Sequence, residues 1–402
     1  MSKQVFIVDG IRTAIGSFGG TLSQVRTDDL GAHVIKELLV RNSTLDPMLI
    51  EDVIFGCANQ AGEDNRNVAR MSGLLAGLPW QVGGETVNRL CASGMASAIN
   101  ASRAIKDGAG DIYIAGGVEH MTRAPWVISK ASKPFGRDAQ MHDSSFGWRF
   151  INPKLEELYG TDAMGTTAEN LVEKYGIDRE SQDKFALWSQ MKAARAIKSG
   201  RFAEEIVSVS IPQRKKDPIT FDTDEFVRAN STMGTLGGLR PAFRKNGSVT
   251  AGNASGLNDG AAALLIASEE AVNKNGLNPL VRIVGASIAG VEPKYMGIGP
   301  VYASEKVLAR TGLSLDQMDI LELNEAFAAQ VLACTRKMGI SDNDERINPN
   351  GGAIALGHPL GMTGARILQT AAQELHKRNK RYALVSMCIG VGQGYATILE
   401  KA

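Results

Sequence analysis

Cys91 is the first residue of this sequence whose surroundings favour chemistry. Three small residues, ASG, follow it, and the apolar spacing from Met95 onward predicts a helix. Glu85–Leu90 resembles the end of a strand, so Cys91 is expected where a strand turns into a helix. Unpaired N–H groups and the dipole at a helix N-terminus favour an anion. The position therefore predicts a lowered thiol pKa and a nucleophile, with a buried, inert cysteine as the alternative.

Three later segments each place one reactive side chain among glycines or at the end of an element. NEAF begins at Asn324, NPNGGAIALGHPLGMTGAR carries His358, and CIGVGQG begins at Cys388. With Cys91 they supply two thiols, one imidazole and one amide, but no acidic residue in an obvious triad position. Taken singly, the histidine suits a turn, the second cysteine a structural position and the asparagine a helix cap. Their joint occurrence favours one site with a nucleophile and acid–base groups.

The composition is that of an ordinary globular protein. A chain of 402 residues exceeds one simple core, so two or three packed units are expected. With 44% hydrophobic and 22% charged residues and a net charge of +1, nothing predicts binding to nucleic acid or to an acidic membrane surface. The cysteines, at positions 57, 91, 334 and 388, are far apart in sequence and suit a reducing cytosol. The sequence contains no cluster of histidines and cysteines, so it does not predict a metal site.

The chain shows no sign of a membrane or secretory segment. It opens with MSKQVFIVDG, which is typical of a strand and a turn and not of a signal peptide. No apolar run reaches about 18 residues, the length expected of a membrane span. We therefore expect a cytoplasmic protein.

The N-terminal part of the sequence alternates strands and helices. Strands are expected at Val5–Val8, Val53–Gly56 and Ile112–Gly117, and IRTAIGSFGG after the first is expected to be a loop. Helices are expected at Thr27–Val40, in a stretch that ends at Leu78, and after Cys91. This order predicts a buried, mostly parallel sheet with helices on its faces.

A different pattern runs from Glu119 to about Val249. It contains helical stretches near Thr167–Tyr175 and Ser181–Ser199, a basic cluster and turns with proline. We expect an insertion that lies over the site. Asn253–Ala267 then returns to the core as a turn and a long apolar element.

The architecture of the first part then recurs. Strands are expected at Val281–Gly285, Asp319–Leu323, Arg381–Met387 and Tyr395–Leu399, and helices at Ala303–Arg310 and Gly364–Leu375. Val53 lies 38 residues before Cys91, and Ile320 lies 38 residues before His358. The repeat predicts an α/β protein with two similar halves packed face to face, whose reactive loops meet at one site.

Five motifs make the chain resemble the thiolase family, the acetyl-CoA C-acyltransferases. They are NRLCASG, TAGNASGLNDGAAA, NEAFAAQ, GGAIALGHPLG and CIGVGQG, in order across nearly the full length. The resemblance implies a thiolase fold, in which two βαβαβ-type halves pack into a layered αβαβα core with an inserted loop domain. The halves are expected at residues 1–118 with 250–272 and at residues 273–402, around a CoA-binding insertion at 119–249.

The resemblance also implies roles for the reactive residues. Cys91 is expected to take the acyl group as a thioester, after activation by His358, whose ordinary pKa near 6.5 suits a base. Cys388 is expected to be the second acid and base. Asn324 is expected to hold a water that completes one oxyanion hole with His358, and the N–H groups of Cys91 and Gly390 are expected to form the other.

For the ligand, the resemblance implies CoA as co-substrate, without a covalently bound cofactor or a metal. No phosphate-binding glycine loop is recognisable, so basic side chains on the insertion are expected to hold CoA. The implied contacts are Ser255 to the pantetheine arm, Phe243 and Ala251 in the CoA groove, Arg228 near the adenine, and Met164, Met296 and Phe327 around the acyl pocket. The family resemblance further implies a homodimer or homotetramer.

Several positions indicate the degradative branch of the family. Ala163 stands where short-chain acetoacetyl thiolases usually carry a histidine, and the last motif contains VGQG in place of GGMG. Glu63–Arg70 and Gly147–Pro153 resemble the 3-oxoadipyl-CoA thiolases of aromatic catabolism. Such a substrate ends in a carboxylate, which needs a partner if it is buried. Arg149 and Arg66 are the candidates, unless both are solvated or structural.

Four alternatives remain for the activity. A general 3-oxoacyl-CoA thiolase of fatty acid breakdown and an acetyl-CoA acetyltransferase differ from the first interpretation only in substrate. A decarboxylating condensing enzyme of the ketoacyl synthase type would need a histidine pair, or histidine with asparagine, and one cysteine, whereas this chain offers a second cysteine. An inactive acyl-CoA-binding relative would not be expected to retain all four reactive residues.

Overall fold

A continuous mixed sheet runs through the computed structural model, which describes residues 3–402. It has 11 strands, with the order β13-β14-β15-β12-β1-β11-β5-β3-β4 and with β2 and β8 beside this path. The strands of the sheet are β1 (Val5–Thr13), β2 (Gly16–Ser17), β3 (Asp52–Gly56), β4 (Glu85–Val87), β5 (Ile112–His120), β8 (Ile206–Val207), β11 (Asn258–Ser268), β12 (Val281–Gly290), β13 (Ile320–Leu323), β14 (Tyr382–Ile389) and β15 (Gln393–Lys401).

The two halves of the sheet repeat one pattern. In the N-terminal half, β3 is parallel to β5, β5 is antiparallel to β11, and β11 is antiparallel to β1. In the C-terminal half, β13 is parallel to β14, β14 is antiparallel to β15, and β15 is antiparallel to β12. The pairs Phe6–Arg282 and Ile7–Val281 join the halves along β1 and β12. The prediction of two similar halves is confirmed.

The prediction of a mostly parallel sheet is wrong. Among the pairings inside each half's repeated pattern, only β3–β5 and β13–β14 are parallel. β15 follows β14 after Gly390–Gly392, and so short a connection allows only an antiparallel neighbour. In the N-terminal half the insertion separates β5 from β11, and the returning strand runs antiparallel to β5. The spacing of apolar residues alone does not determine whether neighbouring strands are parallel or antiparallel.

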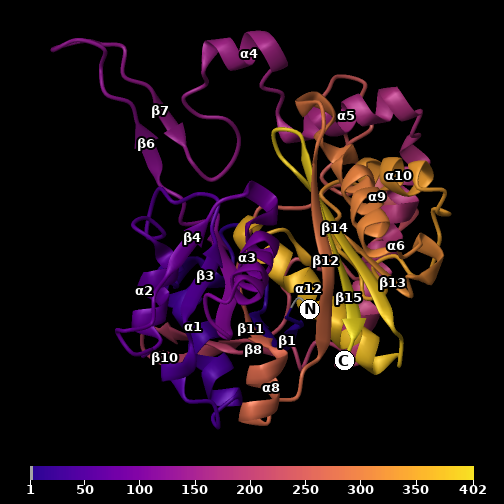
Figure 1. The fold of residues 1–402 in the computed structure, drawn as a ribbon. Helices are drawn as coiled ribbons and strands as arrows, with labels where there is room; N and C mark the ends of the chain where they lie inside the picture. The colour runs from indigo at the N-terminus through magenta and orange to yellow at the C-terminus, as the bar shows by residue number, and fades with distance from the viewer. Residues whose placement is uncertain (1–2) are drawn as a thin grey trace.

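Helices form three layers around the two half-sheets (Figure 1). One outer core lies under α1 and α2 on the N-terminal half, and another lies under α9 and α10 on the C-terminal half. The central core lies between the half-sheets and contains α3 and α12. The bounds are α1 (Thr27–Arg41), α2 (Val68–Leu75), α3 (Ser93–Asp107), α8 (Glu269–Asn275), α9 (Gly299–Thr311), α10 (Ala328–Lys337), α11 (Ala353–Leu356) and α12 (Leu360–Lys377). This is the expected αβαβα arrangement.

Glycines allow the two central helices to approach closely. A Cβ on Gly364 of α12 would lie 2.2 Å from the backbone nitrogen of Met95 in α3, and a Cβ on Gly94 would lie 2.5 Å from the carbonyl oxygen of Gly361. Both distances are far below van der Waals contact, so a larger residue would separate the helices. The contact brings together the first turns of α3 and α12, which follow Cys91 and His358.

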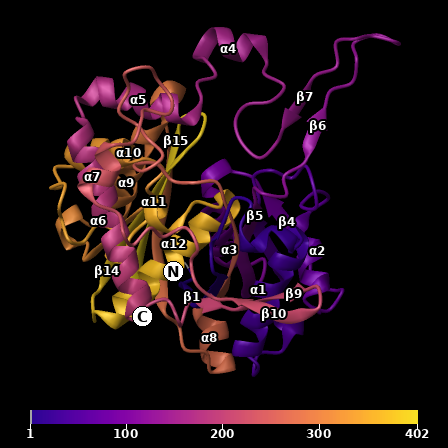
Figure 2. The ribbon, with the colours of Figure 1, turned by 180° about the vertical axis from the view of Figure 1, so that it is seen from behind.

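The insertion rests on both halves and extends beyond them. Its elements are β6 (Trp126–Ile128), β7 (Met141–Asp143), α4 (Pro153–Tyr159), α5 (Met164–Tyr175), α6 (Arg179–Lys198), β9 (Val209–Gln213), β10 (Lys216–Phe221) and α7 (Met233–Gly237). The β6–β7 hairpin projects from the body, and the β9–β10 hairpin lies against the N-terminal half (Figures 1 and 2). Buried ion pairs tie the loops near α6 to the core, Arg12 with Asp224 at 2.7 Å and Arg201 with Glu374 at 2.7 Å.

Most predicted elements occur close to their expected bounds, with a few corrections. The first strand continues to Thr13, so part of the segment predicted as a loop is strand, and the helix expected to reach Leu78 ends at Leu75. Cys388 lies within β14, one residue before its end. Within residues 3–402, no helix combines the length and the apolar character needed to cross a membrane.

Candidate active site

Cys91 lies in a tight turn between β4 and α3. The turn is a 3₁₀ helix, Leu90–Ala92, and Leu90 has a φ of +47°, a conformation that costs a bulky residue energy. The Ser93 side chain holds the turn, because its hydroxyl donates to the carbonyl of Leu90 at 2.7 Å and accepts from the N–H of Arg89 at 2.9 Å. The predicted position, between a strand and a helix, is confirmed.

The prediction of a lowered thiol pKa is wrong for the free protein. Burial raises the pKa of Cys91 to about 11, and the backbone N–H groups of Gly390 and of Cys91 itself oppose this only in part. The turn at the start of α3 is therefore not sufficient by itself to ionise the Cys91 thiol. Cys91 is a thiol at neutral pH, and it needs a base to become a nucleophile.

His358 lies in a loop that the buried Asn258 holds in place. The side-chain oxygen of Asn258 accepts from the N–H of His358 at 2.9 Å, and its amide donates to the carbonyl of Gly16 at 3.0 Å. Gly357 has a φ of +107°, and a Cβ there would lie 2.6 Å from the amide carbon of Asn258. Only glycine fits this position, which explains the G before the H in the motif.

The contacts of the imidazole assign its tautomer. The Thr363 hydroxyl donates to the carbonyl of Pro359 at 2.7 Å, so its oxygen is an acceptor toward His358 Nδ1, which lies 2.8 Å away. The ring therefore carries its proton on Nδ1. This leaves the lone pair of Nε2 available, and Nε2 is the atom that faces Asn324.

His358 is uncharged over the whole neutral range. Burial, and next to it the charge of Arg366, lower the pKa of His358 to about 3, far from the ordinary value assumed for the sequence. A neutral imidazole whose Nε2 carries no proton can accept one. The neutral form is the one that the predicted base requires, and the protein does not stabilise the charged form in the absence of a partner anion.

Asn324 follows β13 and is buried. Its Nδ2 lies 3.4 Å from His358 Nε2, and its Oδ1 has no hydrogen-bond partner among the described residues. The neighbouring Glu325 is held by Ser189 Oγ at 2.6 Å and by the Asn348 amide at 2.7 Å, which keeps the NEAF segment rigid. An unpaired amide oxygen at this depth is suited to holding a small polar molecule.

Cys388 completes the group from the end of β14. It is buried, and burial raises its pKa well above the ordinary range, with Cys91 as the next cause. Both cysteines line the same cleft, so the two sulfurs share one site. After β14 the chain turns sharply, with Val391 at a φ of +61° and Gly392 at +82°.

A cleft of about 820 Å³ unites these groups with the predicted ligand residues. Of the predicted site residues, Cys91, His358, Cys388, Gly390, Arg228, Phe243, Ala251, Ser255, Met164, Met296 and Phe327 line it. Asn324 lies behind His358 and does not line the cleft directly. The size is ordinary for a ligand site, and the lining is mainly apolar.

Packing around the cleft explains several of these positions. The ring of Phe243 lies directly on Gly165, where a Cβ would come within 2.1 Å of it, and meets Phe327 edge-to-face at 6.1 Å between centroids. Ser255 is held by its N–H, which donates to the carbonyl of Ala326 at 3.0 Å. The insertion and the NEAF segment therefore share one wall of the cleft.

Comparison with known proteins adds to this geometry. The family model "Thiolase, N-terminal domain" matches residues 5–270, and "Thiolase, C-terminal domain" matches residues 277–401. The chain belongs to the thiolase family.

Full-length relatives share more than half of their residues with this thiolase. The 3-oxoadipyl-CoA/3-oxo-5,6-dehydrosuberyl-CoA thiolase of Escherichia coli K12 is 58% identical over 399 residues, covering 99% of this chain and 100% of the relative. The beta-ketoadipyl-CoA thiolase of Pseudomonas aeruginosa is 54% identical, with 100% of both chains covered. The crystal structure of human mitochondrial 3-ketoacyl-CoA thiolase in complex with CoA has a TM-score of 0.92 at 39% identity, covering 100% of this chain and 98% of that one.

Membership in the family resolves two of the sequence-based alternatives. The chain is an acyltransferase of the thiolase type. The interpretation as a condensing enzyme of the ketoacyl synthase type is therefore set aside, and it did not account for the second cysteine, Cys388. The inactive relative is disfavoured as well, because Cys91, His358, Cys388 and Asn324 occupy one connected site.

Three further residues of this thiolase site were not predicted from the sequence. Asn258 positions His358, Thr363 assigns its tautomer, and Glu119 lies in the cleft wall. Glu119 accepts from the N–H groups of Ala58, Asn59 and Gly361 at 3.0, 3.0 and 2.8 Å, and burial raises its pKa to about 7. Asn258 lies inside the GLNDGAAA motif, which could have indicated it as a site residue. Glu119 lies near the end of β5 and belongs to no motif that the sequence made recognisable.

Glu119 also belongs to a buried group with Cys57 and Asp64 whose possible ligand atoms lie within 4.8 Å of one another. The carboxylates already accept backbone N–H groups, and the Cys57 thiol donates to Asp64 at 3.4 Å. These hydrogen bonds account for the group without a metal ion.

The structure separates the two candidate arginines. Arg149 lines the cleft, half-buried, and donates to the carbonyl of Ser144 at 3.4 Å. Arg66 is exposed, has a φ of +58° and does not line the cleft. Of the two, only Arg149 lies where a bound acyl group could meet it.

Proposed function

We propose that this thiolase cleaves 3-oxoadipyl-CoA with CoA to give acetyl-CoA and succinyl-CoA, in the β-ketoadipate pathway. The observation that carries the proposal is the cleft in which two thiols, a neutral imidazole and an uncommitted arginine converge. The names of the Escherichia coli and Pseudomonas aeruginosa relatives support the same substrate.

In the first half of the proposed reaction, Cys91 becomes acylated. Its thiol proton moves to His358 Nε2, and the sulfur attacks the C3 carbonyl carbon of the substrate. The C2–C3 bond then breaks, and its electron pair stays on C2 as the enolate of acetyl-CoA. The Cys388 thiol gives its proton to C2 and becomes a thiolate. Acetyl-CoA then leaves, and the remaining acyl group stays bound to Cys91 as a thioester.

In the second half, the acyl group moves to CoA. The Cys388 thiolate takes the thiol proton of CoA, and the CoA sulfur attacks the thioester. The Cys91 sulfur leaves and recovers its proton from His358. Both cysteines return to thiols, so the raised pKa values of the free protein match the start and the end of the cycle.

We assign the remaining groups to charge stabilisation. Asn324, with its unpaired Oδ1, holds a water that donates beside His358 to one developing oxyanion, and the N–H groups of Cys91 and Gly390 serve the other. The effect of those two N–H groups on the pKa of Cys91 supports their direction toward the reacting sulfur.

We assign CoA to the outer part of the cleft. Ser255 is proposed to contact the pantetheine arm, Phe243 and Ala251 to line its groove, and Arg228 to lie near the adenine. Met164, Met296 and Phe327 are proposed to surround the acyl chain. Their place in the cleft lining and the CoA complex of the human relative support this division.

For the terminal carboxylate of the acyl chain we propose Arg149. A buried carboxylate without a partner is costly, and a guanidinium can bind it with two hydrogen bonds. An acetyl-CoA acetyltransferase would have no use for this arginine, because acetoacetyl-CoA has no terminal charge. The comparison of kcat/KM for 3-oxoadipyl-CoA, 3-oxohexanoyl-CoA and acetoacetyl-CoA tests the proposal. A preference for 3-oxohexanoyl-CoA would indicate a general 3-oxoacyl-CoA thiolase.

We further propose a division into residues 1–118 with 250–272, residues 119–249, and residues 273–402. The layers and the family-model ranges support it. Limited proteolysis should cut first within 119–249, where the β6–β7 hairpin extends from the body.

A homodimer or homotetramer in the cytoplasm is also proposed. The β6–β7 hairpin supports assembly, because its apolar Trp126 and Ile128 are 68% and 69% exposed. Four free cysteines support a reducing compartment. Light scattering would measure the mass in solution, and cell fractionation would test the compartment. A monomer, or activity in the membrane fraction, would contradict these proposals.

A further inference from the structure

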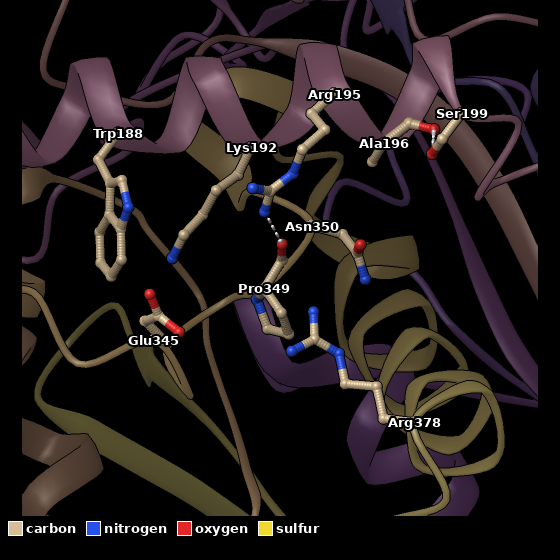
Figure 3. Close-up of a pocket in the computed structure, with 9 residues that line it drawn as sticks. All are labelled: Trp188, Lys192, Arg195, Ala196, Ser199, Glu345, Pro349, Asn350 and Arg378. Atoms are coloured by element: carbon tan, nitrogen blue, oxygen red, sulfur yellow. Dashed lines mark hydrogen bonds between the residues drawn. The ribbon is translucent and has the colours of Figure 1, made fainter.

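A second pocket, remote from the catalytic cleft, lies between α6, the loop before α11 and the end of α12 (Figure 3). Its volume is about 470 Å³, within the range of small-molecule sites. The lining residues are Trp188, Lys192, Arg195, Ala196, Ser199, Glu345, Pro349, Asn350 and Arg378. None of them lines the cleft that contains Cys91.

Three cationic side chains converge on this pocket. Figure 3 shows Lys192 and Arg195 extending from α6 toward the space between α6 and Arg378, which approaches from the end of α12. Arg378 is paired with Glu374, outside the pocket. Arg195 donates only to the carbonyl of Pro349, at 3.5 Å, and has no ion pair within 4.0 Å in residues 3–402. Glu345 is the one acidic residue of the lining and is exposed.

Lys192 is the most constrained of the three cations. It is only 6% exposed, it donates to the carbonyl of Ile347 at 2.5 Å, and its Nζ lies 2.9 Å from the centroid of the Trp188 ring. In its ammonium form Lys192 has three N–H donors, and these contacts use one of them in a hydrogen bond and direct another at the indole. One donor remains for a ligand.

The charges around Lys192 favour an added anion. Burial is the main cause that lowers the pKa of Lys192 to about 7, and Arg195 and Arg378 lower it further. Glu325 and Glu322, on the side of the core, raise it but do not compensate. An anion between the three cations would supply a countercharge to Lys192 and Arg195 on the pocket side. Asn350, whose amide already donates to Glu374 at 2.7 Å, lies beside this space.

We propose that this pocket binds a small oxyanion with two negative charges, either a phosphate group or a dicarboxylate. Lys192 and Arg195 would hold it from α6, Arg378 would face it from α12, and the Trp188 ring would form an apolar wall. The site is separate from the proposed CoA groove, so its occupant is a ligand other than the acyl-CoA substrate.

Isothermal titration of the full-length protein with inorganic phosphate and, separately, with succinate tests this proposal and distinguishes the two sources. Binding of at least one of them with a Kd below about 10 mM is expected. Arg195→Met should raise that Kd roughly tenfold or more, the change expected when one charge-assisted hydrogen bond is lost. Arg195→Lys should retain part of the affinity. Because Arg195 is exposed, these variants are expected to fold.

Two controls locate the binding. Lys198→Met removes an exposed cation from the same helix, outside the pocket, and should leave the Kd unchanged. Arg228→Met removes a cation from the catalytic cleft and should also leave it unchanged. No binding of either anion, equal losses in Arg195→Met and Lys198→Met, or a loss confined to Arg228→Met would each overturn the proposal.

Discussion

Replacing Arg149 by methionine should remove the preference for a terminal carboxylate without disturbing the fold. Arg149 is half-buried in the cleft lining, and its guanidinium makes one long hydrogen bond, at 3.4 Å, to the carbonyl of Ser144. It has no carboxylate partner within 4.0 Å in residues 3–402, so most of its N–H donors are available to a substrate. Methionine keeps an unbranched apolar stem and removes the charge, so little stability depends on the change.

The expected loss of kcat/KM in Arg149→Met follows from the hydrogen bonds that the substrate carboxylate would lose. One charge-assisted hydrogen bond contributes about 1.5–3 kcal/mol, and each 1.4 kcal/mol is tenfold. The kcat/KM for 3-oxoadipyl-CoA should therefore fall by roughly 10- to 150-fold, mainly through KM. The solvent exposure of Arg149 favours the lower part of this range.

Thiolysis can be followed by the loss of the magnesium–enolate absorbance of the 3-oxoacyl-CoA. The matched control substrate is 3-oxohexanoyl-CoA, which has the same chain length without the terminal carboxylate, and its kcat/KM should hardly change. The matched control variant is Arg66→Met, which removes an exposed arginine outside the cleft. Equal losses on both substrates would refute the reasoning, because they would mean that Arg149 holds its loop.

Further predictions concern the reacting groups. Cys91→Ala should abolish activity in both directions, and mass spectrometry of wild type after acetyl-CoA should find one acetyl group on the Cys91 peptide; labelling elsewhere would overturn the assignment. Cys388→Ala should still form the acyl-enzyme but lose carbon–carbon bond cleavage, and acetoacetyl-CoA thiolysis within tenfold of wild type would exclude its acid–base role. Thr363→Val removes the acceptor of His358 Nδ1 and should lower kcat about 10- to 100-fold with KM little changed, whereas Thr363→Ser should retain activity. As pH falls from 6.5 to 5, the unfolded chain protonates His358 and the folded protein, with a pKa of about 3, does not. The unfolding free energy of wild type should then fall by about 2 kcal/mol relative to His358→Gln, and parallel pH profiles would contradict the low pKa.

The order of the elements, and the polar residues that meet at one site, were predictable from the sequence. Helical spacing after Cys91 and after His358 predicted α3 and α12, and glycines marked the tight turns beside them. The equal spacing from Val53 to Cys91 and from Ile320 to His358 indicated the repeat, which appears as two half-sheets with one pairing pattern. These features depend on local backbone preferences and on apolar periodicity, which a single sequence carries.

Strand direction was not predictable in the same way. The sequence favoured a mostly parallel sheet, but β11 and β15 run antiparallel to their neighbours β5 and β14. A buried strand is apolar on both faces whether it runs parallel or antiparallel to its neighbour, so its composition does not distinguish the two directions. The direction depends on where the chain returns after the insertion and after the turn at Gly390.

The sequence by itself indicated which groups could react: two thiols and an imidazole near glycines, and an amide at the end of a strand. Only the tertiary structure decided their protonation and partners. Burial raises the pKa of Cys91 to about 11 and lowers that of His358 to about 3, against what a helix N-terminus and an ordinary imidazole predict. Thr363 sets the tautomer, and Arg149, rather than Arg66, reaches the cleft. The physical reason is that desolvation and hydrogen-bond geometry depend on atoms brought together from distant parts of the chain, whereas a motif specifies only its own neighbours.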